Sequence, residues 1–132
     1  MTDAFVLGGV RTPFARYGSS LSHIRADDLL GMTMNGACER VGVGLDQIED
    51  IVAGCVNPAH EGMGDVARWA ALAAGFPDSV AGATINRFCG SGQQAVGMAA
   101  TGILAGHQDL VIGCGVESMS RPFTAGYDGV PA

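Results

Sequence analysis

Short apolar runs and longer amphipathic stretches follow one another along the chain. The apolar runs have the length and the bounding glycines of buried strands, and β-branched residues such as Thr84 and Ile85 favour a strand in the third of them. A sheet with buried strands is therefore expected. The predicted strands are residues 4–10, 48–56, the stretch from Gly82 that stops at Cys89, and 110–115.

Helical periodicity fills the intervals between these strands. The first helix carries two acidic residues in its first turn, where they suit the helix dipole, and Gly42 ends it. Asp65 caps a second helix over residues 66–74, and a third runs from Gln93 to Leu104. The apolar residues of the first helix fall on one face at helical spacing: Leu30, Met34, Ala37, Cys38 and Val41.

The element order is β-α-β-α-β-α-β, which predicts an α/β fold with a parallel sheet and right-handed crossovers. In such a sheet ligands gather at the carboxyl ends of the strands. Four loops are expected at that edge: residues 11–25, residues 57–64, the Cys89 turn and residues 116–132. His107 precedes the last strand, so it is expected at the opposite edge.

The third helix has no charged face. Residues 93–104 contain no charged side chain, whereas a helix on the outside of a sheet normally has a polar face. We therefore expect this helix to be buried on both sides, by its own sheet and by a further layer. That layer is not visible in the sequence, so the chain reads as truncated.

Composition narrows the class of protein. The chain has 132 residues, 48% of them hydrophobic, with 21 glycines and a net charge of −6. Its seven basic residues are scattered, which argues against nucleic-acid binding and against a membrane-surface patch. No apolar run reaches the roughly 18 residues of a spanning helix, and the first residues do not resemble a signal peptide, so a cytoplasmic location is expected.

The four cysteines are widely spaced and form no CxxC pair, so neither a zinc site nor a disulfide framework is expected. Cys89 differs from the others because it lies directly before a helix. The free N–H groups and the positive dipole end of a helix favour a thiolate, and a thiolate is a nucleophile. The alternative interpretation is a buried structural cysteine, which is what most lone cysteines are.

The same residues carry a second alternative. Residues 90–95 match G-x-G-x-x-G/A after a strand and at the start of a helix, which is the dinucleotide-binding fingerprint. The acidic residue that should follow is misplaced. Asp109 has the right separation but precedes the last strand, and Glu117 follows that strand but is too distant in sequence.

Other candidate residues are weaker. His23 and His60 lie in loops at the carboxyl edge, where either could pair with Cys89, although lone loop histidines are usually solvated. Residues 117–121 follow the last strand and could line a site. The remaining cysteines are expected in the core or without a role: Cys38 and Cys114 in the core, and Cys55 near the edge with no assigned role.

The residues around Cys89 resemble the nucleophile segment of the thiolases, the acyl-CoA C-acyltransferases. That segment is Asn86-Arg87-Phe88-Cys89-Gly90-Ser91-Gly92. Three further segments resemble thiolase segments in the family's order, so the resemblance covers nearly the whole chain. They are Arg11-Thr12-Pro13-Phe14, Arg25-Ala26-Asp27-Asp28-Leu29 and Gly115-Val116-Glu117-Ser118-Met119-Ser120-Arg121.

The resemblance implies a function and a fold. Cys89 would be acylated by an acyl-CoA thioester, with its backbone N–H as one donor to the oxyanion. No cofactor or metal beyond the CoA thioester substrates is implied, and homo-oligomers are usual in the full-length family. Residues 1–132 would be the N-terminal domain of a layered α/β/α/β/α fold, truncated before the loop region and the C-terminal half.

The family's remaining catalytic segments do not occur in the sequence. These are the Asn…Gly-Gly…Gly-His segment and the Cys-x-Gly-Gly-Gly segment, which activate the nucleophile and handle the substrate proton. We therefore expect little or no turnover from this chain alone. The alternative function is a non-catalytic fragment of a thiolase that binds a partner.

Overall fold

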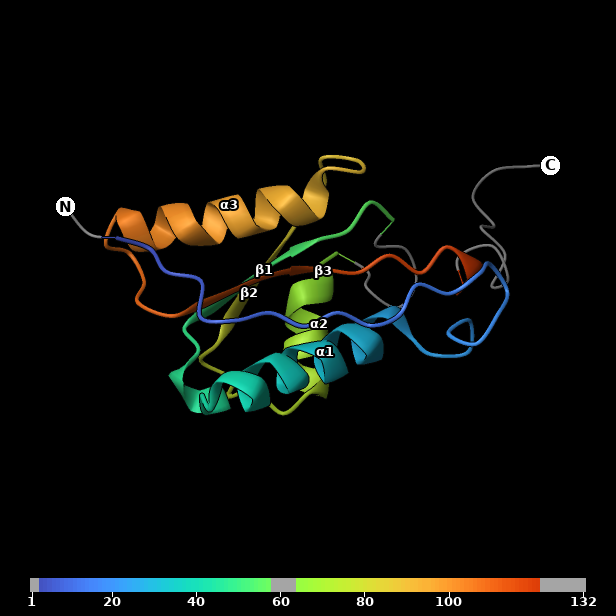
Figure 1. Cartoon of the computed structure of the whole chain (residues 1–132), viewed down its shortest axis with the longest axis horizontal. Helices are drawn as coiled ribbons and strands as arrows, with labels where there is room; N and C mark the ends of the chain where they lie inside the picture. The colour runs from blue at the N-terminus through green and yellow to red at the C-terminus, as the bar shows by residue number, and fades with distance from the viewer. Residues whose placement is uncertain (1–2, 58–63, 122–132) are drawn as a thin grey trace.

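Three parallel strands form the sheet of this protein. The structure is a computed structural model that describes residues 3–57 and 64–121 (Figure 1). The strands are β1 (Asp50–Gly54), β2 (Ala81–Ile85) and β3 (Val111–Gly115), in the order β2-β1-β3. In register, Gly54 pairs with Ile85 on one side and with Gly115 on the other. The three strands therefore end level with one another, and the segments that follow them start from one edge.

The helices lie on both faces of the sheet. α3 (Ser91–Leu104) packs on β1 and β3 on one face, and α1 (Ala26–Val41) packs on α2 (Val66–Ala73) on the other, as Figure 1 shows. A short 3₁₀ helix, η1 (Leu45–Gln47), precedes β1. The predicted α/β class with a parallel sheet is confirmed, and so are the three predicted helices.

The predicted strand over residues 4–10 is wrong. This segment is described, and it has no strand assignment. Phe5, Val6 and Leu7 are 77%, 86% and 62% exposed. A strand needs a neighbouring strand to bind its backbone N–H and C=O groups. An apolar run in the sequence does not show whether such a neighbour is present. Instead, the segment passes the end of α1, where the Arg40 guanidinium donates to the Gly9 carbonyl at 3.0 Å.

The local signals at the helix ends are confirmed. The Asp65 carboxylate accepts the Arg68 N–H at 3.3 Å, which caps α2, and it also accepts the Thr84 hydroxyl at 2.6 Å. Gly42 follows α1 with φ of +70°, and its N–H bonds back to the last turn. This left-handed conformation costs glycine little and ends the helix where the sequence predicts.

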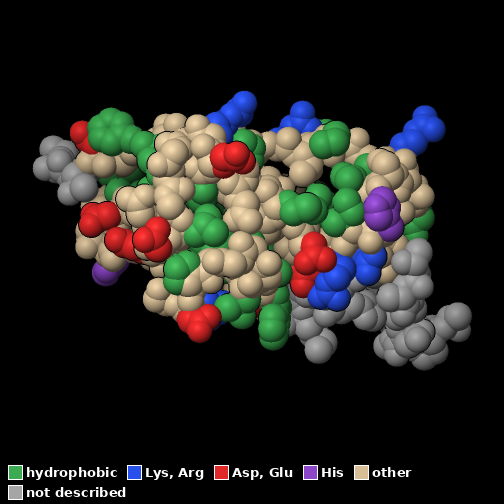
Figure 2. Space-filling model, turned by 90° about the horizontal axis from the view of Figure 1, so that it is seen from below, with side chains coloured by type: hydrophobic (Ala, Val, Ile, Leu, Met, Phe, Trp, Pro, Cys, Tyr) green, Lys and Arg blue, Asp and Glu red, His purple; other side chains and the backbone are tan. Residues whose placement is uncertain are grey.

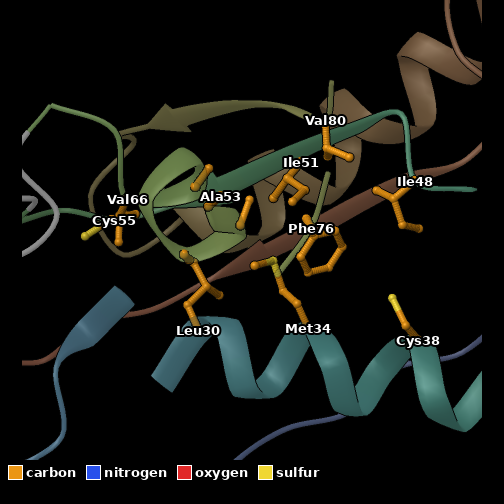
Figure 3. Close-up of a cluster of buried hydrophobic side chains, with 13 residues drawn as sticks. Leu30, Met34, Cys38, Ile48, Ile51, Ala53, Cys55, Val66, Phe76 and Val80 are labelled. Atoms are coloured by element: carbon orange, nitrogen blue, oxygen red, sulfur yellow. The ribbon is translucent and has the colours of Figure 1, made fainter. Parts of the chain in front are cut away.

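The hydrophobic core lies between the sheet and the two helices α1 and α2. Figure 3 shows Leu30, Met34 and Cys38 of α1 directed toward Ile51 of β1 and Phe76, which follows α2. Full burial of a Leu, Ile or Met side chain contributes about 1.5–3 kcal/mol. The amphipathic face predicted for α1 is thus the face that holds this helix to the sheet.

The outer face of α3 is open. Ala95 and Ala99 are buried on the sheet side, whereas Val96, Met98 and Leu104 are each about half exposed, at 48%, 43% and 53%. Among the described residues, α3 is the only helix on that face of the sheet (Figure 1). The expected burial on both sides is therefore not met within this chain, because no element of the described part covers the second side.

Charged side chains of both signs lie on the face of the molecule that Figure 2 shows. On the face in Figure 2, acidic and basic side chains are scattered among apolar and neutral ones, and no basic stripe crosses its described residues. Within residues 3–57 and 64–121, no helix has the length and apolarity needed to cross a membrane.

Candidate active site

The Cys89 turn connects the end of β2 to the start of α3. β2 ends at Ile85, and α3 begins at Ser91 with Gly90 as its N-cap. Phe88 has φ of +49°, the only positive φ of a non-glycine residue in the described part of the chain. A left-handed conformation at such a residue costs roughly 1–3 kcal/mol and persists only where its surroundings hold it.

Ser91 stabilises this turn through three hydrogen bonds. The residue is buried, with 4% of its surface exposed. Its hydroxyl accepts the Arg87 N–H at 2.7 Å and donates to the Phe88 carbonyl at 2.6 Å. The Ser91 N–H also donates to the Phe88 carbonyl, at 3.0 Å. The serine of the Cys-Gly-Ser-Gly sequence therefore holds the backbone on the N-terminal side of Cys89.

The thiol of Cys89 is exposed and lies directly before the first turn of α3. This placement agrees with the predicted strand–cysteine–helix arrangement. The N-terminal end of a helix carries a partial positive charge and N–H groups without intrahelical partners. An oxygen that becomes negatively charged beside the helix start is stabilised at such a position.

Gly54 allows β1 to approach the start of α3 very closely. A Cβ atom at this position would lie 2.3 Å from the Ser91 carbonyl carbon and 2.4 Å from the Gly92 nitrogen. Only glycine leaves room for this contact between backbones. Gly54 was not among the predicted site residues, although a glycine inside a predicted strand is a known signal of close backbone approach.

The other three cysteines are not comparable nucleophiles. Burial raises the pKa of Cys114 to about 12. Burial, with the negative charge of Glu117 as the second cause, raises the pKa of Cys55 to about 11, and burial also raises the pKa of Cys38. All three stay protonated near neutral pH, in agreement with the predicted core positions of Cys38 and Cys114.

Glu117 and Asn86 bind the segment that follows β1. The Glu117 carboxylate accepts the N–H groups of Val56 and Asn57 at 2.7 and 3.1 Å. The Asn86 amide donates to the Val56 carbonyl at 3.0 Å. Glu117 is thus engaged with the protein backbone, which disfavours its use as the acidic residue of a dinucleotide site. Glu117 was predicted at this edge, but no separate role was predicted for Asn86.

The loop that precedes α1 contacts the loop that follows β3. The Ser120 hydroxyl accepts the Gly18 N–H at 2.8 Å, and Arg121 donates to the Ser22 carbonyl at 3.4 Å. Residues 11–25 and 116–121 therefore lie together, as their predicted positions imply. His23 is exposed in the first of these loops.

Among the described residues, no histidine is hydrogen-bonded to Cys89. His107 lies between α3 and β3, at the opposite edge, as predicted. His60 falls outside the described residues. In the described part of the chain, no three His, Cys, Asp or Glu residues are grouped in a way that could hold a metal ion.

The fold and this turn define a class: an α/β protein with a parallel sheet that presents an exposed cysteine between a strand and a helix. Comparison with known proteins identifies the family within this class. Residues 4–129 match the family model described as the N-terminal domain of thiolase. The chain therefore belongs to the thiolase family.

Several relatives are similar over nearly the whole chain. A 3-oxoadipyl-CoA/3-oxo-5,6-dehydrosuberyl-CoA thiolase of Escherichia coli is 50% identical over 128 residues, 96% of this chain and 32% of the relative. A beta-ketoadipyl-CoA thiolase of Pseudomonas putida is 44% identical over the same shares. This chain thus spans about a third of the length of these curated relatives.

A solved structure supports the fold. The Bacillus anthracis acetyl-CoA acetyltransferase superposes with a TM-score of 0.86 at 36% identity, covering 92% of this chain and 30% of that one. The predicted thiolase-type α/β fold is therefore confirmed for the part that this chain covers.

Proposed function

We propose that this chain carries the nucleophile of an enzyme that transfers acyl groups between coenzyme A thioesters. Cys89 is the catalytic residue in this proposal. The observation that supports it is the exposed thiol at the start of α3, on a turn fastened by the buried Ser91. The similar proteins named for 3-oxoadipyl-CoA and beta-ketoadipyl-CoA point to a 3-oxoacyl-CoA as the class of substrate.

In the degradative direction, the Cys89 thiolate attacks the 3-keto carbon of the substrate. The S–C bond forms, the bond between carbons 2 and 3 breaks, and the released carbanion takes a proton to leave as acetyl-CoA. A second CoA thiol then attacks the acyl-cysteine and restores the thiol of Cys89. In synthesis, acetyl-Cys89 is attacked by the carbanion of a second acetyl-CoA.

The developing oxyanion needs hydrogen-bond donors in both directions. We assign one of them to the backbone N–H of Cys89, at the start of α3. The proton transfers need a base, and His23 and His107 are exposed at positions that do not match the family's catalytic segments. We therefore expect this chain by itself to be acylated once and to turn over little or not at all.

The test is acylation of the purified chain by acetyl-CoA, followed by mass mapping of the cysteine-containing peptides. We expect acetyl groups on Cys89 and none on Cys38, Cys55 or Cys114, because burial and raised pKa values protect the other three. Cys89→Ala is the matched control and removes the label. The proposal fails if Cys89 stays unmodified, and steady-state thiolysis of acetoacetyl-CoA would contradict the expected lack of turnover.

A second candidate is a non-catalytic module that binds a partner. The half-exposed Val96, Met98 and Leu104 on the outer face of α3 favour it, because exposed apolar patches commonly mark interaction sites. The DNA downstream of Ala132 distinguishes the two. An encoded Gly-His segment and Cys-x-Gly-Gly-Gly segment favour the enzyme, and their absence favours the module. A cytoplasmic location and homo-oligomers in a longer form remain predictions.

A further inference from the structure

The ends of the three strands are tied together at one residue, Val56. This residue follows β1. Its backbone N–H and carbonyl are both hydrogen-bonded to side chains of residues that follow the neighbouring strands. Its N–H donates to the Glu117 carboxylate, beyond β3, at 2.7 Å. Its carbonyl accepts from the Asn86 amide, beyond β2, at 3.0 Å.

Asn86 continues this connection to the nucleophile turn. Its side-chain oxygen accepts the Phe88 N–H at 2.9 Å while its amide nitrogen donates to Val56. Phe88 is the residue with φ of +49°, and it directly precedes Cys89. A primary amide offers both a donor and an acceptor, so one Asn side chain can hold Val56 and Phe88 together.

We propose that Asn86 and Glu117 are positioning residues for Cys89: through Val56, they keep Phe88 in its left-handed conformation and the thiol at the start of α3. This inference rests on the proposed role of Cys89 as the nucleophile. Neither residue touches the reacting atoms in this assignment. Their action is to restrict the turn, so that the thiol does not have to be ordered when the substrate arrives.

The positions of these groups argue for this role over a purely structural one. Asn86 and Glu117 are both exposed. The core lies between the sheet and the helices α1 and α2, and neither residue belongs to it. Substitution of an exposed side chain outside the core leaves the packing intact. Loss of these bonds therefore acts mainly on the turn, where Phe88 can leave its strained left-handed conformation.

The test measures the rate of Cys89 alkylation by iodoacetamide in the whole 132-residue chain, at fixed pH. The variants are Asn86→Ala and Glu117→Gln, with cysteine peptides followed separately. The matched control is Glu49→Gln. The Glu49 carboxylate also accepts a backbone N–H, that of Asp109 at 2.9 Å, but at the amino-terminal end of the sheet.

We expect alkylation of Cys89 to slow by about fivefold in Asn86→Ala, the ratio that corresponds to one net hydrogen bond. Glu117→Gln should slow it by a smaller factor, and Glu49→Gln should match the wild type. The direction is informative for Glu117. Removing a negative charge at this edge by itself favours a thiolate, so slower alkylation identifies lost positioning.

Two further readouts separate positioning from general loosening. Unfolding would speed the alkylation of the buried Cys38 and the partly buried Cys114, whereas lost positioning leaves their rates unchanged. Cys55 does not serve as this control, because the charge of Glu117 itself helps to raise the pKa of Cys55. Since the two side chains act in series through Val56, the double variant should be no slower than Asn86→Ala alone.

The inference is overturned if Cys89 reacts at the wild-type rate in both variants, or if Cys38 and Cys114 become more reactive in them. If one variant does not fold, the other decides between these results. The experiment distinguishes failure of this inference from failure of the proposed function. Acetylation of wild-type Cys89 with unchanged variant rates overturns only this inference, whereas slowed variants without acetylation of the wild type overturn only the proposed function.

Discussion

Replacing Gly54 with alanine is the most direct test of how the sheet places the nucleophile turn. The new methyl group would lie 2.3 Å from the Ser91 carbonyl carbon and 2.4 Å from the Gly92 nitrogen. Ordinary van der Waals contact begins at 3.4 Å, so β1 and the start of α3 must separate by roughly 1 Å. Both neighbours are backbone atoms, which cannot turn aside as a flexible side chain can.

The cost follows from this rigidity. Overpacking in a well-packed interior costs about 1–3 kcal/mol, and contact with backbone places Gly54→Ala at the upper end, near 3 kcal/mol. Domains of this kind have a total stability of about 5–15 kcal/mol. The substitution therefore removes a large part of the stability, and it displaces the helix start that Cys89 precedes.

The assay is urea denaturation, with the free energy of unfolding taken from the midpoint and slope. Gly97→Ala is the matched control, because it adds the same methyl group to α3 where no atom lies within 4 Å. Alanine is the better helix former, so this variant should gain up to about 1 kcal/mol. A Gly54→Ala protein within about 0.5 kcal/mol of the wild type would refute the close contact between β1 and α3.

Two further predictions concern the cap of α2 and the thiol of Cys114. Asp65→Ala removes the acceptor for the Arg68 N–H and the Thr84 hydroxyl and should lower the free energy of unfolding in urea by about 1–2 kcal/mol; an unchanged midpoint would contradict the cap. Burial raises the pKa of Cys114 from 9.0 to about 12. The folded thiol therefore keeps its proton to higher pH than the unfolded one, so its contribution to stability is complete below pH 9.0 and is lost as the pH rises toward 12. Unfolding measured from about pH 9 to 11 should lose stability less steeply in Cys114→Ala than in the wild type, and parallel curves would show that this thiol does not titrate abnormally.

The helices and their ends were predictable because their signals are local. Asp65 and Gly42 act within one turn of their own helix, through a side-chain cap and a left-handed residue. The apolar face of α1 follows from a period of 3.6 residues. Such features depend only on residues close in sequence, and the structure confirms each of them.

In the N-terminal segment, the local sequence pattern does not specify the structure. Residues 4–10 have the composition of a buried strand, but a strand also needs a partner along its whole length, and Phe5, Val6 and Leu7 are exposed instead. The same holds for α3. Its lack of charge was evident from the sequence, but whether a second layer covers it depends on contacts outside the described residues.

For the nucleophile turn, the sequence alone determined that a cysteine follows a strand and precedes a helix, together with the resemblance to thiolases. Only the tertiary structure decided how that cysteine is held. Gly54 and Val56 lie more than 30 positions from Cys89, and Glu117 lies 28 positions beyond it. Parallel strands bring these residues to one edge because each strand ends level with its neighbours. Contacts between segments so far apart in the chain depend on the register of the sheet, and parallel strands are joined by long crossovers rather than by a short turn that would fix this register locally.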